Sequence, residues 1–486
     1  RIDRNNDGIV KQSDGDDLRS AYFAFDVTNP EWHVGNTAVA PKLLWVFNGE
    51  DDADHDLGFT TGFPAIMRVK SNSADTEKKG TWYVTFGSGP LSYKGERDMA
   101  SPSNLFYNDS SEYGKLYVID LLTGRFRAKL NMGGADRYAF MGDPTVLDLE
   151  RTKGEPIDDV VYIGKTYGTK TTYDGNDFWN WKGKAHRILT NSEINPEGWT
   201  ISTLIDPAKP VLMPVIASSD QKGRPWVFFG TGRLFSSGPQ GSDNGDMSLG
   251  NRIYGIKEGG PNGCWNSSEG IWKKGCTTTI EIDQSLVNVT DIKVKKGGYL
   301  SATTTAFSTV FGFADRVIND PDNPQGGKSG WYIDLKAGER ALVSPSILAG
   351  ALFLPTYTPD NGNDVCSVFG NSTLYGLYYE TGTAFANQIN EKGLFNKESS
   401  DETVLRDNSS VLINKNLQGE ARDSASNRGM GAGIASGVIF TIGKVDEIGR
   451  IVIEVKSQSS SGNITTGSIA VVVPRSGVKM FMDKVE

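Results

Sequence analysis

Histidine and cysteine are scarce in this 486-residue chain, which has only three of each. Three scattered histidines provide few ligands for a histidine-based zinc or iron site. There is no Cys-x-x-Cys-His segment, which excludes a c-type haem attachment. No Gly-x-Ser-x-Gly segment occurs either, so a serine nucleophile with its histidine base is not indicated. We therefore expect a protein that is not an enzyme.

The sequence also lacks long apolar runs and an excess of basic residues. No stretch of 18 or more apolar residues occurs, so no membrane-spanning helix is predicted. Fifty Lys and Arg against 59 Asp and Glu give a formal net charge of −9, which argues against a nucleic-acid partner because phosphate contacts need clustered basic residues. The chain opens on Arg1 without methionine, which we interpret as a processed product or a fragment whose targeting signal lies elsewhere.

Glycine and aromatic residues, in contrast, are abundant, with 57 Gly and 10% aromatics. Runs of β-branched and aromatic residues recur along the chain, and Gly, Pro, Asn and Asp bound nearly all of them. Helical periodicity over eleven or more residues is hard to find. The pattern predicts an all-β fold with many tight turns.

A loose repeat indicates the arrangement of these strands. An aromatic-rich strand is followed by a turn with Asp and often Thr-Gly, as in Leu116-Tyr-Val-Ile-Asp120-Leu-Leu-Thr-Gly124 and Leu374-Tyr-Gly-Leu-Tyr-Tyr-Glu-Thr-Gly382. Strands that end in glycine lie upstream. This order is typical of four-stranded propeller blades. We predict one domain over 1–486, a modified β-propeller of about seven blades, in preference to an array of β-sandwiches.

The repeats are unevenly spaced, so the blades must carry long loop insertions. Polar stretches mark these insertions at Lys70–Gly80, Gly238–Gly250 and Phe385–Arg428. Loops on one face of a propeller often bind the partner. A solvent-exposed insertion that binds no partner has the same polar composition. Both interpretations of 385–428 stay open.

The sharpest local motif lies within residues 1–17. Asp3-Arg-Asn5-Asn-Asp7-Gly8-Ile9 is followed by an acidic residue at position twelve, Asp14. Oxygen ligands at alternate positions of a tight loop can converge on one Ca²⁺, and the glycine permits the sharp turn. We predict a calcium site in which the candidate ligands are Asp3, Asn5, Asp7, the Ile9 carbonyl and Asp14. The alternative is an Asn/Asp/Gly turn without an ion.

Two of the three cysteines, Cys264 and Cys276, bracket a short loop that contains glycine and two tryptophans. This spacing predicts a disulfide-closed surface loop, and hence an oxidising compartment. Two free thiols in a reducing compartment are the alternative. Cys366 is left over. The segment Phe178-Trp-Asn-Trp181 could stack a sugar or a cofactor, but packing between blades is the commoner use of such tryptophans.

Several motifs together resemble the C-terminal propeller of PilY-type type IV pilus biogenesis factors and tip adhesins. They are Tyr22-Phe-Ala-Phe-Asp-Val-Thr-Asn-Pro30, Pro41-Lys-Leu-Leu-Trp-Val-Phe47, Gly142-Asp-Pro-Thr-Val-Leu-Asp148, Phe229-Gly-Thr-Gly-Arg233, Gly330-Trp-Tyr-Ile-Asp-Leu335 and Gly338-Glu-Arg340. The shared order of these motifs, over residues 20 to 450, carries the resemblance.

The resemblance implies a non-enzymatic protein at the cell surface or pilus tip of a Gram-negative bacterium, exported through the periplasm. It implies minor pilins and a host, abiotic or other cell surface as partners, and calcium-linked control of pilus extension and retraction. The family's calcium loop follows the Asp-Pro-x-Val segment. In this chain the segment after Gly142-Asp-Pro-Thr-Val is longer than the family's loop and has fewer carboxylates at the family's spacing. Asp148, Glu150 and Asp158 therefore form a second, less favoured ligand set.

Another class of propeller, the pyrroloquinoline quinone-dependent dehydrogenases, is the alternative function. These enzymes have an adjacent-cysteine disulfide in the cofactor pocket, and no Cys-Cys pair occurs here. Their tryptophan-docking repeat is also not kept, because Gly124-Arg-Phe-Arg lacks the tryptophan. We therefore favour a calcium-stabilised propeller that docks on minor pilins, mainly through strand edges and loops.

Overall fold

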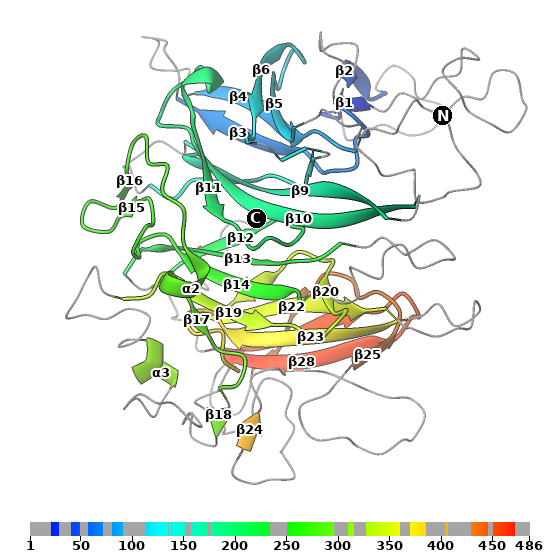
Figure 1. Ribbon diagram of the computed structural model, residues 1–486, viewed down its shortest axis with the longest axis vertical. Coiled ribbons are helices and arrows are strands. Elements are labelled where there is room, and N and C mark those ends of the chain that lie inside the picture. The colour runs from blue at the N-terminus through cyan, green and yellow to red at the C-terminus, as the bar shows by residue number, and fades with distance from the viewer. Residues whose placement is uncertain are drawn as a thin grey trace, which may run out of the picture. The chain divides into compact units, whose positions relative to one another are not determined.

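Short strands joined by tight turns make up most of the structure, a computed structural model (Figure 1). It describes residues 21–28, 40–48, 57–70, 80–90, 113–134, 136–137, 139–150, 157–173, 176–220, 222–233, 250–292, 294–295, 310–314, 327–359, 370–384, 404–406, 429–445 and 451–471. The predicted calcium loop at Asp3–Asp14, Cys366 and most of the insertion at 385–428 lie outside these residues.

The chain divides into two compact units. Unit 1 comprises Arg1–Val215, Arg233–Ser248 and Cys264–Ile282, and unit 2 comprises Ile216–Gly232, Leu249–Gly263 and Asp283–Glu486. The single domain over 1–486 stays a prediction.

Unit 1 contains three sheets in chain order and one short hairpin. The first sheet pairs β1 (Ala21–Asp26) with β2 (Lys42–Asn48), and the second joins β3 (Ala65–Val69), β4 (Thr81–Gly87), β5 (Lys115–Asp120) and β6 (Phe126–Asn131). The third joins β7 (Phe140–Met141), β8 (Thr145–Leu147), β9 (Val160–Tyr173), β10 (Asn176–Leu189) and β11 (Thr200–Ile205). The hairpin is β15 (Trp265–Asn266) with β16 (Ile271–Trp272), and a 3-10 turn, η5, spans Pro196–Gly198.

Unit 2 is built in the same way. One sheet has β12 (Ile216–Ser219), β13 (Pro225–Gly230), β14 (Arg252–Lys257), β19 (Gly330–Asp334) and the parallel β17 (Val287–Asn288). The next has β20 (Arg340–Ala341), β21 (Ser346–Leu348), β22 (Ala351–Thr358), β23 (Asn371–Tyr378) and β25 (Gly429–Ala432), and the last has β26 (Ile439–Val445), β27 (Ile451–Gln458) and β28 (Ile464–Val471). The remaining short elements are β18 (Val294–Lys295), which pairs with β24 (Val404–Arg406), and the helices α2 (Ile282–Ser285) and α3 (Val310–Phe313).

The inner strands of these sheets are buried on both faces. Every residue of Val160–Ile163 in β9 is fully buried, as is nearly every residue of Pro225–Gly230 in β13. Within unit 1, Val161 and Ile163 of β9 pack against Leu116 and Val118 of β5. Within unit 2, Phe228 and Ile253 pack against Leu352 and Leu354 of β22. The all-β prediction is confirmed, and β3–β6 form a four-stranded, up-and-down antiparallel sheet. The propeller of seven blades stays a prediction.

The predicted Asp-x-x-Thr-Gly turn forms between β5 and β6. Asp120 Oδ1 accepts hydrogen bonds from the backbone N–H groups of Leu122 and Thr123, 3.2 and 3.0 Å away, and from the Thr123 hydroxyl. Gly124 closes the turn with a φ of 68°, a conformation that glycine adopts without strain. Each residue of the repeat thus has a turn-forming role.

This glycine also receives a tryptophan from the preceding sheet. The Trp45 ring in β2 lies where a Cβ of Gly124 would be, and its Nε1 donates to Leu121 O at 2.8 Å. Unit 2 repeats the arrangement, since the Trp331 ring in β19 covers Gly382 (φ 67°) and its Nε1 donates to Tyr379 O at 2.8 Å. A tryptophan therefore docks on the turn glycine in both units, but it comes from the preceding sheet and not from the turn itself, where the sequence pattern places it.

A second set of glycines in unit 1 lets a chain segment lie directly on a sheet. A Cβ on Gly142, Gly164 or Gly183 would collide with backbone atoms of residues 209–212. We call Lys209–Leu212 the strap, because it crosses β9 and β10 after leaving β11. Only glycine permits so close an approach of two backbones.

We predict that Trp331→Phe destabilises the protein by about 2–3 kcal/mol, because it removes a buried hydrogen bond and leaves a cavity. The free energy of unfolding in urea measures this. Trp82→Phe is the matched control, since Trp82 is 45% exposed, and we expect a change below about 0.5 kcal/mol. Equal effects of the two substitutions would contradict a docking role for Trp331.

Candidate functional site

The strongest concentration of carboxylates that the sequence analysis singled out lies where β8 passes into β9 in unit 1. Leu147 pairs with Val160, which brings the two ends of the intervening loop together. The backbone N–H of Asp159 donates to Leu147 O at 2.9 Å. Asp148, Glu150, Asp158 and Asp159 therefore gather at one end of the sheet, and we call these four residues the acidic cluster.

Backbone groups hold two of these carboxylates. Asp159 Oδ2 accepts from the N–H groups of Leu149 and Glu150 at 2.8 and 2.7 Å. Asp158 Oδ2 accepts from the N–H of Arg68 in β3 at 2.6 Å. The loop ends are thus fixed to each other and to the neighbouring sheet.

Burial makes the three aspartates of the acidic cluster hard to ionise. It raises the pKa of Asp159 to about 7, the backbone N–H bonds oppose that rise, and the charges of Glu150 and Asp148 add to it. Burial also raises the pKa of Asp148 and of Asp158, and the charge of Asp148 further raises that of Asp158. Like-charged carboxylates that raise one another's pKa are a donor set that a bound cation stabilises.

The fit of a calcium ion to this place is incomplete. Calcium takes six to eight oxygen ligands, whereas no group of three or more His, Cys, Asp or Glu side chains is arranged to hold a metal within the described ranges. The loop residues 151–156 lie outside those ranges. Asp148, Glu150 and Asp158 thus stay predicted ligands, and so do Asp3, Asn5, Asp7, Ile9 and Asp14.

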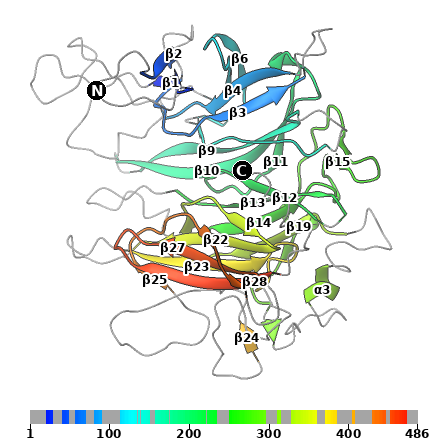
Figure 2. The same cartoon turned by 180° about the vertical axis from the view of Figure 1, so that it is seen from behind.

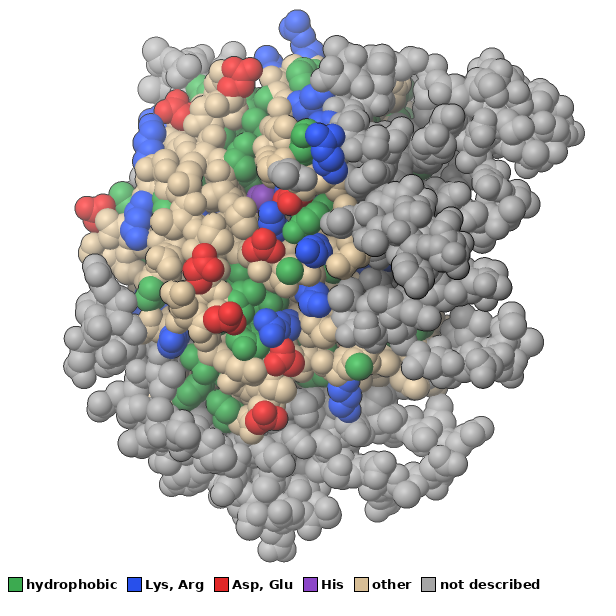
Figure 3. Space-filling view, viewed as in Figure 1, with side chains coloured by type: hydrophobic (Ala, Val, Ile, Leu, Met, Phe, Trp, Pro, Cys, Tyr) green, Lys and Arg blue, Asp and Glu red, His purple; other side chains and the backbone are tan. Residues whose placement is uncertain are grey.

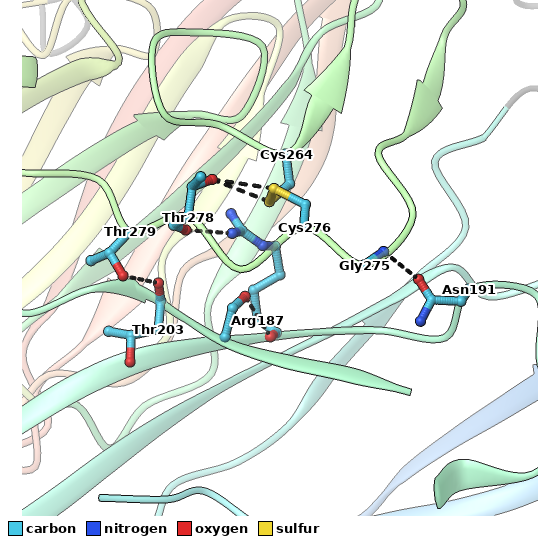
Figure 4. The surroundings of a disulfide bond; sticks show 9 residues. Arg187, Asn191, Thr203, Cys264, Gly275, Cys276, Thr278 and Thr279 are labelled. Atoms are coloured by element: carbon cyan, nitrogen blue, oxygen red, sulfur yellow. Dashed lines mark hydrogen bonds between the residues drawn. A yellow bond between two sulfur atoms is a disulfide. The ribbon is translucent and has the colours of Figure 1, made fainter. Parts of the chain in front are cut away.

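The predicted disulfide is present beside the acidic cluster. Cys264 and Cys276 are bonded, with their Cα atoms 5.7 Å apart, and they close the β15–β16 hairpin (Figure 4). Inside the hairpin, the rings of Trp265 and Trp272 meet edge to face at 5.1 Å. We call Cys264–Cys276 the disulfide hairpin.

The disulfide hairpin is anchored to β10 and β11. Arg187 Nη2 donates to Thr278 O at 2.7 Å, and the Thr279 hydroxyl donates to Thr203 O at 3.0 Å (Figure 4). Ile280 continues along β11 and donates to Leu204 O at 2.9 Å. The segment after Cys276 therefore covers the outer edge of β11.

One hydrogen bond joins the disulfide hairpin to the acidic cluster. Glu150 Oε1 accepts from the backbone N–H of Trp272 at 2.7 Å. Glu150 is one of the predicted calcium ligands, and Trp272 lies in the loop that the two cysteines were predicted to close. Their contact spans 122 residues of sequence, and no local pattern signals it.

A second polar group lies where the apolar packing between β3–β6 and β9–β10 ends. Asp136 Oδ2 bonds to Lys165 Nζ and Lys184 Nζ at 2.7 and 2.8 Å. Lys165 Nζ also donates to the carbonyls of Met132 and Gly133 at 3.1 Å. Burial would raise the pKa of Asp136, but the hydrogen bonds from both lysines outweigh it and hold that pKa below its usual value.

His186 lies beneath this group and is buried. Burial lowers its pKa to about 3, and the charges of Lys165 and Lys184 act in the same direction, while Asp136 opposes them. Neither ring nitrogen makes a side-chain hydrogen bond of normal geometry among the described residues. His186 is therefore a neutral, buried residue of this sheet.

The Trp-rich segment contributes one tryptophan whose side chain is described. Trp181 is buried, with the Phe140 ring at 6.0 Å and the Arg233 guanidinium 4.5 Å over its ring. It acts as a packing residue, as the commoner interpretation predicts. On the face drawn in Figure 3, basic and acidic side chains are interspersed over the described residues, and neither sign dominates. No helix in the described part of the chain is long and apolar enough to cross a membrane.

Comparison with known proteins identifies relatives by sequence. No protein-family model matches the chain. Two curated proteins of Xylella fastidiosa, each named type IV pilus biogenesis factor PilY1 homolog, are 25% identical over 396 residues and 27% identical over 369 residues. The matches cover 76% and 74% of this chain but 21% and 23% of the relatives, so the chain spans about a fifth of their length. They confirm the resemblance to PilY-type factors.

Solved structures offer no comparable match. An N-acetylgalactosamine deacetylase from F. plautii aligns with a TM-score of 0.26 and 6% identity, over 85% of this chain and 90% of that chain. The GH43 protein BlXynB from Bacillus licheniformis aligns with a TM-score of 0.22 and 9% identity, over 85% and 53%. Domains 1–2 of Drosophila Semaphorin 1b give 0.20 and 9%, over 74% and 76%. Scores this low carry no information on fold or activity.

We predict that replacing Cys264 and Cys276 together by serine lowers the free energy of unfolding by about 3 kcal/mol, because the unfolded chain regains the entropy of the closed loop. Urea unfolding without reductant measures the loss. Cys366→Ser is the control, with an expected change below about 0.5 kcal/mol. If dithiothreitol lowers the stability of the double variant as much as that of the parent, this explanation is wrong.

We also predict that acid destabilises the protein through His186. The folded state does not bind a proton on this ring until the pH nears 3, whereas the unfolded chain binds one near pH 6.5. Stability is therefore complete above pH 6.5 and declines as the pH falls from 6.5 towards 3. Between pH 7 and pH 5 the loss is about 2 kcal/mol.

His186→Leu serves as the comparison, because all other titrating groups stay the same. Urea unfolding at pH 7 and pH 5 should show a loss that is about 2 kcal/mol smaller in the variant. Identical losses in the two proteins would show that His186 does not contribute.

Proposed function

We propose that this chain is the propeller module of a pilus-associated protein that acts in type IV pilus biogenesis at the cell surface and catalyses no reaction. The observation that carries the proposal is the sequence match to two PilY1 homologs over about three quarters of the chain. The shared order of motifs from Tyr22 to Arg340 supports it. In this role the chain docks on minor pilins at the pilus tip and presents loops for adhesion.

The stacked sheets suit a docking scaffold. Inner strands buried on both faces make a rigid support, and recognition is then left to strand edges and to loops. The disulfide between Cys264 and Cys276 fits an exported protein, because such bonds persist in oxidising compartments. Figure 2 shows the hairpin of β15, which this disulfide closes, at the side of the sheets of unit 1.

Calcium has a stabilising role in this proposal. The Asp3–Asp14 loop is the first candidate site, and Asp148, Glu150 and Asp158 are the second. A bound cation would favour the ionised forms of Asp148 and Asp158, whose pKa values are raised by burial when no cation is present. Control of extension and retraction would follow if calcium orders a loop on which docking depends.

We predict that the purified, extensively dialysed chain keeps about one calcium ion and shows no quinone absorbance. Elemental analysis and an ultraviolet–visible spectrum measure both. Asp3→Ala should remove the calcium, and Asp148→Asn, the matched single carboxylate change at the other site, should leave it in place. If Asp148→Asn removes the calcium and Asp3→Ala does not, the calcium site lies in the acidic cluster. A quinone chromophore would favour the dehydrogenase alternative.

The pilus role itself is tested by binding. The purified chain should co-sediment with sheared type IV pili that retain their minor pilins, and should be lost from pili of a strain that lacks them. Equal binding to both preparations would overturn docking on minor pilins.

A further inference from the structure

The first sheet of unit 1 is apolar on both faces. Among the described residues, β1 and β2 pair only with each other (Figure 1). Their inner face carries Tyr22, Trp45 and Phe47, which are buried in one cluster with Val84 and Phe86 of β4. The rings of Tyr22 and Phe86 lie 4.1 Å apart. The inner face is therefore packed against the sheet of β3–β6.

The opposite face of this sheet is exposed. Side chains at alternate positions of a strand share a face, so Phe23 and Phe25 both point away from the packed side. The register places Val46 opposite Phe23 and Leu43 opposite Phe25. A bulge at this point makes Leu44 an additional exposed residue of β2. The outer face, as we call this surface, consists of Phe23, Phe25, Val27, Leu43, Leu44 and Val46, each between 43% and 69% exposed.

The outer face is large enough to be an interaction surface. Its six side chains expose on the order of 500 Å² of apolar area, and patches of this size on a single chain often bind a partner. The patch is continuous, since the rings of Phe23 and Phe25 meet edge to face at 5.5 Å. A two-stranded sheet is also only marginally stable by itself. We expect a second layer to cover it.

We propose that this layer is a second copy of the chain, with the outer faces of two β1–β2 sheets packed on each other about a two-fold axis. This proposal does not depend on the proposed function. None of the six residues is charged, so the partner must offer a surface that is equally uncharged and shaped to fit a sheet. A second outer face meets both conditions, because a two-fold interface uses the same patch on each copy.

Side-chain size and charge indicate the direction of the axis. On the outer face β1 contributes two phenylalanine rings, whereas β2 contributes only aliphatic side chains. An axis parallel to the strands lays β1 of one copy over β2 of the other, so rings meet smaller side chains and interdigitate with them. Asp26 and Lys42 are paired at one end of the hairpin. The same axis brings each of them towards the opposite charge on the second copy.

The area of the outer face also sets the kind of dimer. Two outer faces together would bury on the order of 1,000 Å², which is the lower limit for a specific interface. Obligate dimers bury at least twice as much. We therefore expect a reversible dimer that forms at micromolar concentrations.

Phe23→Glu tests the interface. It places two carboxylates within the apolar contact, and we expect the dissociation constant of the dimer to rise by about a hundredfold or more. Phe63→Glu is the matched control, because Phe63 is also exposed but lies outside the β1–β2 sheet. Sedimentation velocity from about 1 to about 100 μM should show reversible dimers for the parent and for Phe63→Glu, and monomers for Phe23→Glu. Near-ultraviolet circular dichroism checks that both variants are folded.

Thiol reactivity provides an independent measurement. Val46→Cys, in a chain that also carries Cys366→Ser, should react with a thiol reagent more slowly as the protein concentration rises, because the dimer covers this position. Phe63→Cys in the same background should react at one rate throughout.

Three results would overturn the proposal. The first is a parent that stays monomeric over the whole concentration range. The second is a monomeric Val46→Cys variant that reacts slowly at every concentration, which would show that another segment of the same chain covers the outer face. The third is a monomeric parent whose binding to pili is lost in Phe23→Glu but kept in Phe63→Glu, which would assign the outer face to a pilin.

Discussion

A tryptophan ring packed on a glycine of positive φ determines how consecutive sheets meet in both units. Trp45 in β2 and Trp331 in β19 each cover the turn glycine of the next sheet and donate to a carbonyl three residues before that glycine. The large apolar ring contributes buried area, and the single N–H fixes its direction. Stacking alone would bring two sheets together without setting their rotation. The docked ring sets it, and the buried inner strands then pack in one register.

The local pattern of the sequence was enough to predict the strands and turns. Runs such as Val160–Ile163 are strands because β-branched and aromatic side chains fill both faces, and the Asp120 turn forms from bonds within four residues. The Cys264–Cys276 bond was predictable for the same reason, since its loop is short. Tryptophan docking was not, because its partners are 76 and 48 residues apart and depend on which sheets become neighbours.

In the candidate site, too, the sequence predicts local features but not the contacts between distant segments. Asp148, Glu150 and Asp158 were selected from their order along the chain, and the pairing of Leu147 with Val160 brings them together. Asp159 was missed, although it is the most strongly perturbed carboxylate of the cluster, because its pKa follows from burial by the surrounding sheets. The bond from Trp272 to Glu150 was missed as well. This bond links Glu150 to a hairpin that a disulfide closes. The disulfide hairpin and a cation bound at the acidic cluster would therefore both restrain Glu150.

The strap has a consequence for the order of folding. Residues 209–212 lie against Gly142, Gly164 and Gly183, which belong to or adjoin three different strands, and this surface exists only once those strands are paired. We therefore expect the strap to join after its sheet has assembled and to contribute little to the transition state. Changes within it should accelerate unfolding and leave the folding rate almost unchanged. In the proposed role at the cell surface, the lifetime of the folded protein would then depend on the unfolding rate, which the strap controls, more than on equilibrium stability.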